Sequence, residues 1–247
     1  MLVLLPPSET KATGGDGAPL DLETLGHPSL TPVRRRVAEA LVRSAADPEA
    51  ARTALGLSER QADLVRVNAD LFGAPTLPGL RRYTGVLYDG LGYATLPRAA
   101  RARADEMLVV ASALFGLVRA TDPIPAYRLS GGSVLPELGT LPALWRPALA
   151  PVLAAVDGPI LDLRSGAYAA LAPLPDAITV RVLTERADGT RSVVSHFNKH
   201  HKGLLVRALV SGRAQLGDLA AVLRVARRAG YRVEKTGTAS FDLVTAG

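Results

Sequence analysis

The window from Ser195 to Arg207, with the sequence SHFNKHHKGLLVR, holds the densest group of residues that can do chemistry. The chain contains four histidines and four lysines, and three of the histidines and two of the lysines lie in this window. Lysine binds anions, and histidine transfers protons near neutral pH. Their concentration therefore indicates an anion site or an acid–base centre.

The same window predicts the start of a helix. Asn198 is a good N-cap residue, and the sequence that follows favours a helix from about Lys199 to Val210. His200 and Lys202 would then lie in its first turns. Cations are unusual there, because free N–H groups and the helix dipole favour anions. We interpret this arrangement as a site that holds an anion, to which Asn198 would also contribute.

One face of the predicted helix gathers the polar residues. At about 100° per residue, Lys202 lies at the edge of a face formed by Lys199, His200, Gly203 and Arg207. Gly203 would let a ligand approach the backbone closely. The alternative is a solvated basic turn on an ordinary helix. Asp188-Gly189, between two β-branched runs, predicts a type I′ hairpin just before the window.

Polar residues also follow three stretches that we predict as buried strands, namely Met1–Leu5, the apolar run starting at Leu108, and Ile160–Leu163. Polar residues at strand exits are typical of sites in α/β proteins. The candidates for anion or substrate binding are Ser8, Lys11, Arg119, Tyr127, Arg128, Ser165 and Tyr168. Solvated turns, or an internal ion pair between Arg119 and Asp122, are the structural alternatives.

Residues 33–72 predict a helix-hairpin-helix-like element. Two helical segments flank a turn at Gly56, and Ser58 caps the second. A glycine turn of this kind can present N–H groups to a DNA phosphate. The candidate DNA contacts are Gly56, Arg52, Arg60 and Arg66. Two helices joined through a glycine are also common in simple packing.

The remaining segments predict a strand and turn in the glycine-rich stretch Arg81–Leu96, an amphipathic helix ending at Gly230, and a last strand in FDLVTAG. No internal repeat or linker divides the 247 residues, and 48% apolar content suffices for a substantial core. The chain lacks an apolar run of about 18 residues and a signal peptide. With no cysteine, a cytoplasmic protein is expected.

The net charge of +6 suggests a polyanionic partner, although arginine accounts for 25 of the 29 basic residues and aromatics for only 4% of the chain. That aromatic content is too low for a platform that stacks single strands. No zinc spacing completes the His196, His200 and His201 cluster, so we predict no metal. A Walker loop, a dinucleotide fingerprint and a nucleophile elbow are missing, so no cofactor is predicted.

Five blocks in order resemble the YaaA family of peroxide-stress proteins: LLPPSETKA, YTGVLYDGL, SALFGLVRATDPIPAYRLSGG, ILDLRSGAY and SHFNKHHKGLLVR. The resemblance runs nearly end to end. It implies a single mixed α/β domain over residues 1–247, with a central mixed sheet, flanking helices, a basic cleft and a helix-hairpin-helix-like element. It also implies DNA binding and a role in limiting oxidative damage by keeping free iron low.

The resemblance places ten residues of this chain in the cleft: Ser8, Lys11, Arg119, Tyr127, Arg128, Ser165, Tyr168, Lys199, Lys202 and Arg207. The pair His200-His201 differs from the small residues common in relatives. The main hypothesis is a DNA-binding stress protein that contacts phosphates without reading sequence.

The second hypothesis is an enzyme on a small anionic or nucleotide-like substrate. Lys199 and Lys202 would crowd each other, which can lower a lysine pKa to that of a usable base or nucleophile. His200 or His196 would transfer protons. A structural protein without a nucleic-acid partner is the third possibility.

Overall fold

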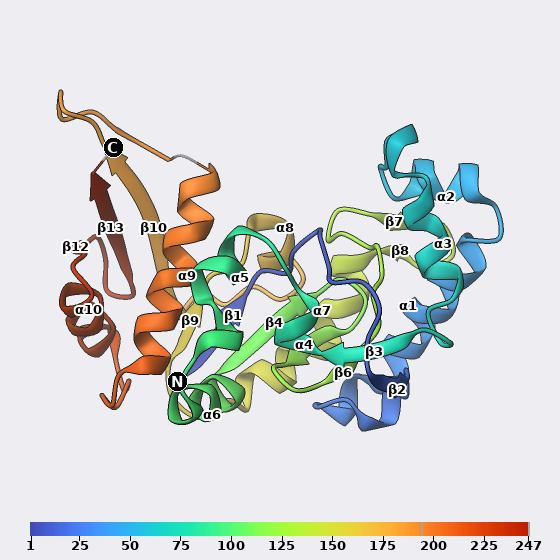
Figure 1. Cartoon of the computed structure of the whole chain (residues 1–247), viewed down its shortest axis with the longest axis horizontal. Coiled ribbons are helices and arrows are strands. Elements are labelled where there is room, and N and C mark those ends of the chain that lie inside the picture. The colour runs from blue at the N-terminus through green and yellow to red at the C-terminus, as the bar shows by residue number, and fades with distance from the viewer. Residues whose placement is uncertain (194, 247) are drawn as a thin grey trace.

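The computed structural model describes residues 1–193 and 195–246, and the side chains of 195–197 and 246 lie outside the description. The architecture is mixed α/β, with a central sheet in the strand order β12-β13-β10-β9-β1-β4-β5, and β11 pairs with β10 (Figure 1). Its strands are β1 (Leu2–Leu5), β4 (Leu108–Ser112), β5 (Gly116–Arg119), β9 (Ile160–Asp162), β10 (Ile178–Glu185), β11 (Arg191–Ser192), β12 (Arg232–Lys235) and β13 (Ser240–Ala246). One small sheet contains β2 (Gly17–Pro19), β3 (Pro75–Pro78) and β6 (Pro123–Ile124). A second contains β7 (Val134–Leu135) and β8 (Gly139–Thr140).

The helices cover the sheet and form a projecting group at one end. They are α1 (Thr31–Ser44), α2 (Pro48–Ala54), α3 (Asp63–Ala69), α4 (Gly79–Arg82), α5 (Val86–Leu91), α6 (Arg98–Met107), α7 (Leu141–Ala154), α8 (Gly166–Ala169), α9 (Ser195–Ser211) and α10 (Leu219–Arg228). Short 3-10 turns lie at Leu22–Thr24, Pro28–Leu30, Glu59–Gln61 and Tyr93–Thr95. None of the described helices combines the length and apolar character needed to cross a membrane.

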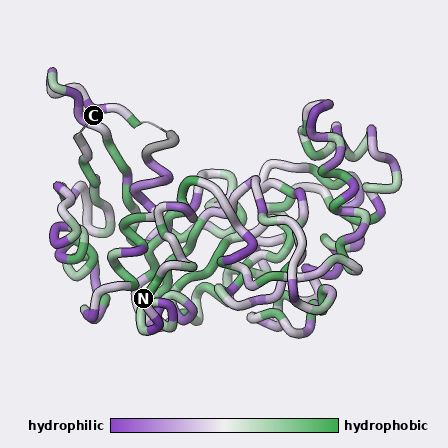
Figure 2. The backbone as a smooth tube through the Cα atoms, in the orientation of Figure 1, coloured by the Kyte–Doolittle hydropathy of each residue, from purple (hydrophilic) through white to green (hydrophobic). Residues whose placement is uncertain are grey.

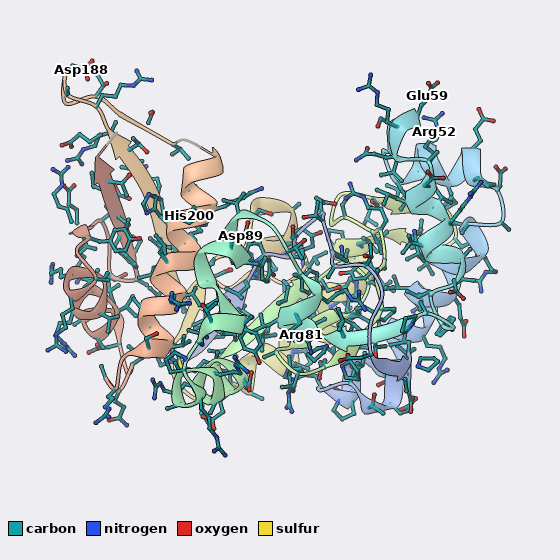
Figure 3. The ribbon with its side chains drawn as sticks, viewed as in Figure 1. Arg52, Glu59, Arg81, Asp89, Asp188 and His200 are labelled. Atoms are coloured by element: carbon teal, nitrogen blue, oxygen red, sulfur yellow. The ribbon has the colours of Figure 1, made fainter. Side chains whose placement is uncertain are left out.

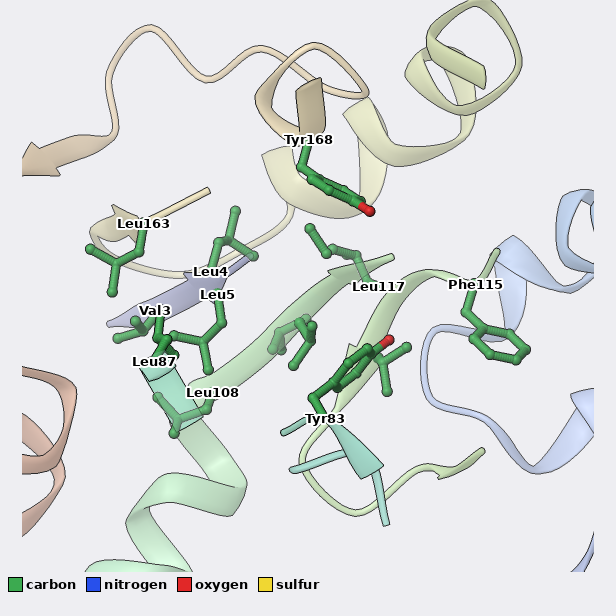
Figure 4. Close-up of a cluster of buried hydrophobic side chains, with 14 of the residues drawn as sticks. Val3, Leu4, Leu5, Tyr83, Leu87, Leu108, Phe115, Leu117, Leu163 and Tyr168 are labelled. Atoms are coloured by element: carbon green, nitrogen blue, oxygen red, sulfur yellow. The ribbon is translucent and has the colours of Figure 1, made fainter. Parts of the chain in front are cut away.

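The first strand is the centre of the fold. β1 pairs in parallel with β4 on one side and β9 on the other, and Val3 lies opposite Leu108 and Leu161. Figure 4 shows the β1 side chains Val3, Leu4 and Leu5 packed among buried leucines of neighbouring elements. Figure 2 shows hydrophobic colouring along the inner strands and hydrophilic colouring on outer helices and loop tips. The chain therefore leaves β1 between two parallel neighbours that extend the sheet in opposite directions.

Three predicted strands are confirmed within one or two residues, namely the first strand, the strand at Ile160 and the C-terminal strand. The buried strand predicted at Leu108 is also confirmed, as β4, and the run then turns at residues 113–115; the rest of the run differs from the prediction, because it forms β5, which pairs antiparallel with β4. Gly116 starts β5 with a φ of 71°. A Cβ on Gly116 would lie 2.6 Å from the buried Trp145 ring, so the turn also requires glycine for space.

The hairpin at Asp188-Gly189 is confirmed, but its type I′ turn is wrong. β10 and β11 pair antiparallel, and Gly189 alone of the two residues has a positive φ, of 81°. The Asp188 carboxylate accepts hydrogen bonds from the backbone N–H and hydroxyl of Thr190, at 2.9 and 2.6 Å. This local bonding favours an ordinary turn followed by one left-handed glycine.

The predicted strand at Arg81–Leu96 is also wrong. This stretch forms α4, α5 and a 3-10 turn. Gly85 and Gly92, with φ values of 99° and 55°, bound α5 and allow sharp changes of direction at both ends. The apolar face of α5 packs on α9, so tertiary contacts rather than β-propensity determine its structure.

The element predicted at residues 33–72 contains one helix more than expected. α2 intervenes between α1 and the turn at Gly56, so the turn joins α2 to α3. Ser58 and Gln61 form a capping box at the next turn, as the Ser58 cap predicted. Figure 1 shows α1, α2 and α3 grouped at the end of the molecule opposite β10, β12 and β13.

Candidate functional site

A pocket of about 470 Å³ lies at the carboxyl ends of β1 and β9. Its lining comes from the loop after β1, the start of α5, the loop after β9, and α9. The lining residues are Pro6, Pro7, Ser8, Glu9, Thr10, Thr84, Gly85, Val86, Leu87, Tyr88, Leu163, Ser165, Tyr168, Asn198, Lys199 and Lys202. In α/β proteins, ligands bind outside the carboxyl ends of strands where neighbouring connections diverge, and β1 is such a position here.

The loop after β1 is fixed by hydroxyl groups. Tyr88 Oη donates a 2.8 Å hydrogen bond to the carbonyl oxygen of Pro6. The hydroxyls of Ser8 and Thr10 lie 3.1 Å apart, and Thr84 Oγ1 donates to Thr10 Oγ1 at 3.2 Å. These contacts hold three hydroxyl groups on one wall. Thr84 and Thr10 donate to each other's oxygens, so the Ser8 hydroxyl is the one that can donate to an anionic ligand while these bonds persist.

Lys11 lies behind this wall. Its Nζ donates a 3.0 Å hydrogen bond to the Ser8 carbonyl oxygen and lies 4.1 Å from the centre of the Tyr127 ring. Burial is the main cause that lowers the pKa of Lys11 to about 7. Glu9 opposes this shift, whereas Arg128 and Arg82 add to it. Lys11 is thus the lysine whose charge changes near neutral pH.

A hydrogen-bonded tyrosine cluster surrounds that amine. Tyr83 Oη and Tyr127 Oη lie 2.9 Å apart, and Tyr127 Oη lies 2.8 Å from Ser112 Oγ. Burial raises the pKa of both phenols and that of Tyr168, so all three are neutral at pH 7. Tyr127 is buried and supports Lys11, and it does not line the pocket itself.

Arg128 also acts through a neighbour. Its guanidinium forms an ion pair with Glu9, a lining residue, and Nη1 donates to the Glu9 carbonyl oxygen at 3.2 Å. The Arg128 backbone is held by the fully buried Asn68 of α3, whose amide accepts from Arg128 N–H at 2.7 Å and donates to its carbonyl oxygen at 2.9 Å. The helical element is therefore connected to the pocket through one arginine.

The exit of β9 contributes Ser165 and Tyr168. Arg164, between the strand and Ser165, forms two hydrogen bonds with the Asp162 carboxylate, at 2.9 and 2.7 Å, and one with the Ala172 carbonyl oxygen at 2.9 Å. This buried ion pair fixes the turn and places both Ser165 and Tyr168 on the pocket wall.

The predicted start of α9 is wrong. The helix already includes Ser195, so Asn198 is a first-turn residue rather than its N-cap, and Lys199 lies in the second turn. The dipole argument for an anion at Lys199 is correspondingly weaker. Asn198, Lys199 and Lys202 nevertheless line the pocket. Asn198 Oδ1 is buried and has no hydrogen-bond partner among the described residues.

Lys202 is held in place by the sheet. Its Nζ donates to the Leu163 carbonyl oxygen at 3.3 Å, and burial lowers its pKa while Asp162 opposes the shift. Burial, not crowding by Lys199, is thus the cause of the lowered pKa.

Gly203 has a different role from the predicted one. A Cβ there would lie 2.1 Å from the Leu87 carbonyl oxygen, and a Cβ on Gly90 would lie 2.5 Å from the His200 carbonyl oxygen. The two glycines allow α5 and α9 to cross in close contact. Gly203 therefore admits a neighbouring helix where a ligand was expected.

Three other predicted residues lie away from the pocket lining. Arg207 Nη1 donates to the carbonyl oxygens of Leu91 and Gly92, at 2.9 and 3.0 Å, and so caps α5. The Arg119 side chain packs against Gly26. His200 packs against Gly90, and its ring centre lies 5.9 Å from that of His201. The alternative prediction of an Arg119–Asp122 ion pair is wrong for the described residues: the Asp122 carboxylate accepts the backbone N–H of Arg119 at 2.9 Å and does not pair with its guanidinium.

The amino-acid sequence that forms this site matches a known family. A family model described as peroxide stress protein YaaA matches residues 1–236. The chain belongs to the YaaA family of peroxide-stress proteins. A UPF0246 protein of Corynebacterium efficiens is 49% identical over 95% of each chain, and one of Corynebacterium glutamicum is 46% identical over 95% of each. A UPF0246 protein of Streptomyces coelicolor is 49% identical over 95% of this chain and 92% of its own.

In this YaaA-family chain, the backbone N–H groups of the turn at Gly56 form hydrogen bonds within the helical element itself. The N–H groups of Gly56 and Leu57 donate to carbonyl oxygens of α2, at 3.1 and 2.9 Å, and Ser58 N–H donates to Gln61 Oε1 at 3.2 Å. Gly56 has a φ of 63°, which ends α2 in a left-handed cap. These three N–H groups are therefore already bonded within the element.

The basic residues of the element are mixed with acids. Arg52 donates to the Leu57 carbonyl oxygen at 3.2 Å, and Arg66 lies 3.8 Å from the Asp63 carboxylate in a highly exposed pair. Figure 3 labels the basic Arg52 and the acidic Glu59, both at the outer end of this element. The segment 46–72 holds three basic residues, namely Arg52, Arg60 and Arg66, and five acidic ones, namely Asp47, Glu49, Glu59, Asp63 and Asp70.

Sequence reasoning missed Thr84 and Tyr88 as lining residues, and it left Glu9 and Thr10, which follow the first strand, out of the candidate list. Each lies within a block that carries the family resemblance, so position in those blocks was the available signal. No group of three potential metal ligands occurs among the described residues. The predicted proton-transfer role of His196 concerns a side chain outside the description.

Proposed function

We propose that this protein is an enzyme that acts on a small anionic substrate in the pocket after β1 and β9. The convergence of Ser8, Ser165 and Lys202 from three elements on one pocket of about 470 Å³ carries this proposal. Hydroxyl and ammonium donors around a bounded pocket suit a phosphate or carboxylate group on a ligand of nucleotide size or smaller.

The lining also suits a second polar group on the ligand. Asn198 Oδ1 is a buried acceptor without a described partner, and leaving such an atom unbonded costs about 1–3 kcal/mol. A ligand with a hydroxyl or amino group beside its anionic group would satisfy it. The substrate class is therefore an anion that also carries a hydrogen-bond donor.

The two lysines of α9 have different roles in this proposal. Lys199 is exposed at the pocket wall and attracts the anion, whereas Lys202 is half-buried and anchored at Leu163. The lowered pKa of Lys202 makes it the better acid–base group of the pair. His200 backs onto α5 and has a lesser part in this proposal.

Binding of inorganic phosphate tests the anion site. We expect millimolar phosphate to raise the melting temperature of the parent protein, and the double variant Lys199→Ala/Lys202→Met to need at least ten times more phosphate for the same rise. Lys235→Ala is the control for loss of positive charge away from the pocket, because Lys235 is exposed on β12; it loses one positive charge where the double variant loses two. Equal phosphate responses of the double variant and the parent would refute the site.

The physiological role proposed is cytoplasmic and concerns peroxide stress, as family membership suggests. Deletion of the gene in its host should increase killing by hydrogen peroxide, and the parent gene should restore survival. The Lys199→Ala/Lys202→Met gene should fail to do so at equal protein level. Full restoration of survival by that variant would show that the pocket lysines are not needed for the role in peroxide stress.

DNA binding is the second candidate, and the net charge of +6 favours it. The helical element supports it less, because its turn donors are bonded and the part that contains the turn, residues 46–72, holds five acids against three bases, although the whole element at 33–72 holds seven bases and six acids. Binding to duplex DNA should fall steeply between about 50 and 200 mM salt if phosphates are the target. An Arg52→Ala/Arg60→Ala/Arg66→Ala variant with unchanged affinity would exclude this element as the contact, and absence of binding at low salt would exclude DNA.

A further inference from the structure

We propose that Lys11 is a nucleophile that forms an imine with an aldehyde or ketone group of the anionic ligand. This inference rests on the proposed function, since it names the chemical class of the substrate of the same pocket. It adds a carbonyl group to the anionic group that Lys199 and Lys202 would bind.

The position of the amine carries the inference. Nζ lies one hydrogen bond, 3.0 Å, behind Ser8, which lines the pocket. Lys11 does not itself line the pocket, so the reaction requires its flexible stem to turn Nζ away from the Ser8 carbonyl and past Ser8. Lys11 is half-buried, so it is not fully enclosed.

The neighbours of Lys11 leave the amine without a carboxylate partner among the described residues. Glu9, the nearest acid, pairs with Arg128 instead. The aromatic groups near Nζ are the neutral phenols of Tyr83 and Tyr127, whose ring centres lie 5.5 and 4.1 Å away. The Tyr127 ring face favours the ammonium form, and Glu9 acts in the same direction.

Burial and the cations oppose that preference. Arg128 and Arg82 disfavour a further positive charge, and with burial they bring the pKa of Lys11 to about 7. A substantial share of Lys11 is then the free amine at neutral pH, which is the form that attacks a carbonyl carbon. A lysine with the ordinary pKa of about 10.4 is almost fully protonated under the same conditions.

The step balances without an oxidant or a cofactor. The nitrogen lone pair of Lys11 forms a C–N bond to the carbonyl carbon, and the carbonyl oxygen takes up the proton that nitrogen loses. The C–O bond of this carbinolamine then breaks, and the oxygen leaves as water with the second nitrogen proton. The product is a C=N bond between Lys11 and the ligand.

Pyridoxal 5′-phosphate, an aldehyde with a phosphate group, is a suitable probe, and sodium borohydride reduces its imine to a stable amine. The chain has only four lysines, so peptide mass mapping assigns the label. At pH 7.5 and limiting probe, we expect the label on Lys11 to exceed that on Lys235 at least tenfold. Protein unfolded in urea should lose this preference.

Two variants test the amine. One removes the nucleophile at position 11 and keeps its charge, and the other removes the anion site and keeps the nucleophile. Lys11→Arg keeps a positive charge and should abolish the selective label while phosphate still raises the melting temperature. Lys199→Ala/Lys202→Met should lower the rate of Lys11 labelling by the phosphate probe at least fivefold and leave labelling by pyridoxal, which lacks the phosphate, unchanged.

The outcomes distinguish the two proposals. Equal labelling of Lys11 and Lys235 in the folded protein would overturn the imine proposal, even if phosphate binding at Lys199 and Lys202 stands. Selective labelling of Lys11 that proceeds equally fast with pyridoxal and with its phosphate would retain the nucleophile but overturn the anionic substrate. Selective labelling that depends on both features supports both.

Discussion

Lys11 is a half-buried base beside neutral phenols, and its protonation is linked to the stability of the fold. Its pKa is about 7 in the folded protein and near the ordinary 10.5 when unfolded. Below pH 7 both states bind the proton, and the folded state bears the full cost of a poorly solvated ammonium. As pH rises from 7 to 10.5 the unfolded state alone holds the proton, so this cost declines.

Replacement of Lys11 by methionine should therefore stabilise the protein in a pH-dependent way. We expect Lys11→Met to raise the urea midpoint at pH 6 and to raise it less, or not at all, at pH 9.5. Lys235→Met, at an exposed position, should behave alike at the two pH values. A Lys11→Met effect that is constant from pH 6 to 9.5 would contradict the lowered pKa.

At this scale the sequence predicted the strand exits better than the contacts between them. Ser8 and Ser165 were predictable because apolar runs end just before them, at Leu5 and Leu163. The pairing of Arg128 with Glu9 joins residues far apart in the chain, and no local pattern indicates it. The lowered pKa of Lys11 likewise depends on distant rings.

The crossing of α5 and α9 is the element-scale feature that shapes the pocket. Both helices contribute lining residues, and close approach at Gly90 and Gly203 sets their separation. Sequence patterns could not show this, because the stretch Arg81–Leu96 is rich in tyrosine and glycine and reads locally as a strand. Its helical structure is a result of packing.

Gly203→Ala should destabilise the protein, because its Cβ would lie 2.1 Å from the Leu87 carbonyl oxygen and the helices would have to separate. We expect a loss of about 1–3 kcal/mol in the free energy of unfolding, as for other overpacked sites. Urea denaturation measures it. Gly166→Ala is the control, since a Cβ there meets no atom within 4 Å and should change stability little. Similar results for the two variants would argue against a close crossing.

On the scale of the whole molecule, buried side chains tie the helical element at one end to the sheet and its pocket: Arg34 donates to the carbonyl oxygens of Phe115 and Leu117, and Asn68 bonds to the Arg128 backbone. Fold class and the central sheet were predictable from apolar runs and the family resemblance, whereas the extra helix α2 and this connection were not. Asn68 looks like an ordinary helical residue in sequence. Only the fold brings its amide to the Arg128 backbone, 60 residues away.

Replacement of Asn68 by leucine should release this connection. The change leaves the Arg128 N–H and carbonyl without their hydrogen-bond partners. Each buried group left unpaired costs about 1–3 kcal/mol in the free energy of unfolding. We expect faster amide hydrogen exchange in α2, α3 and residues around Arg128, and weaker phosphate binding because the Arg128–Glu9 pair is no longer fixed beside the pocket. Arg66→Ala, at an exposed position on α3, should change neither measurement. Faster exchange with unchanged phosphate affinity would show that the helical element supports the fold without acting on the pocket.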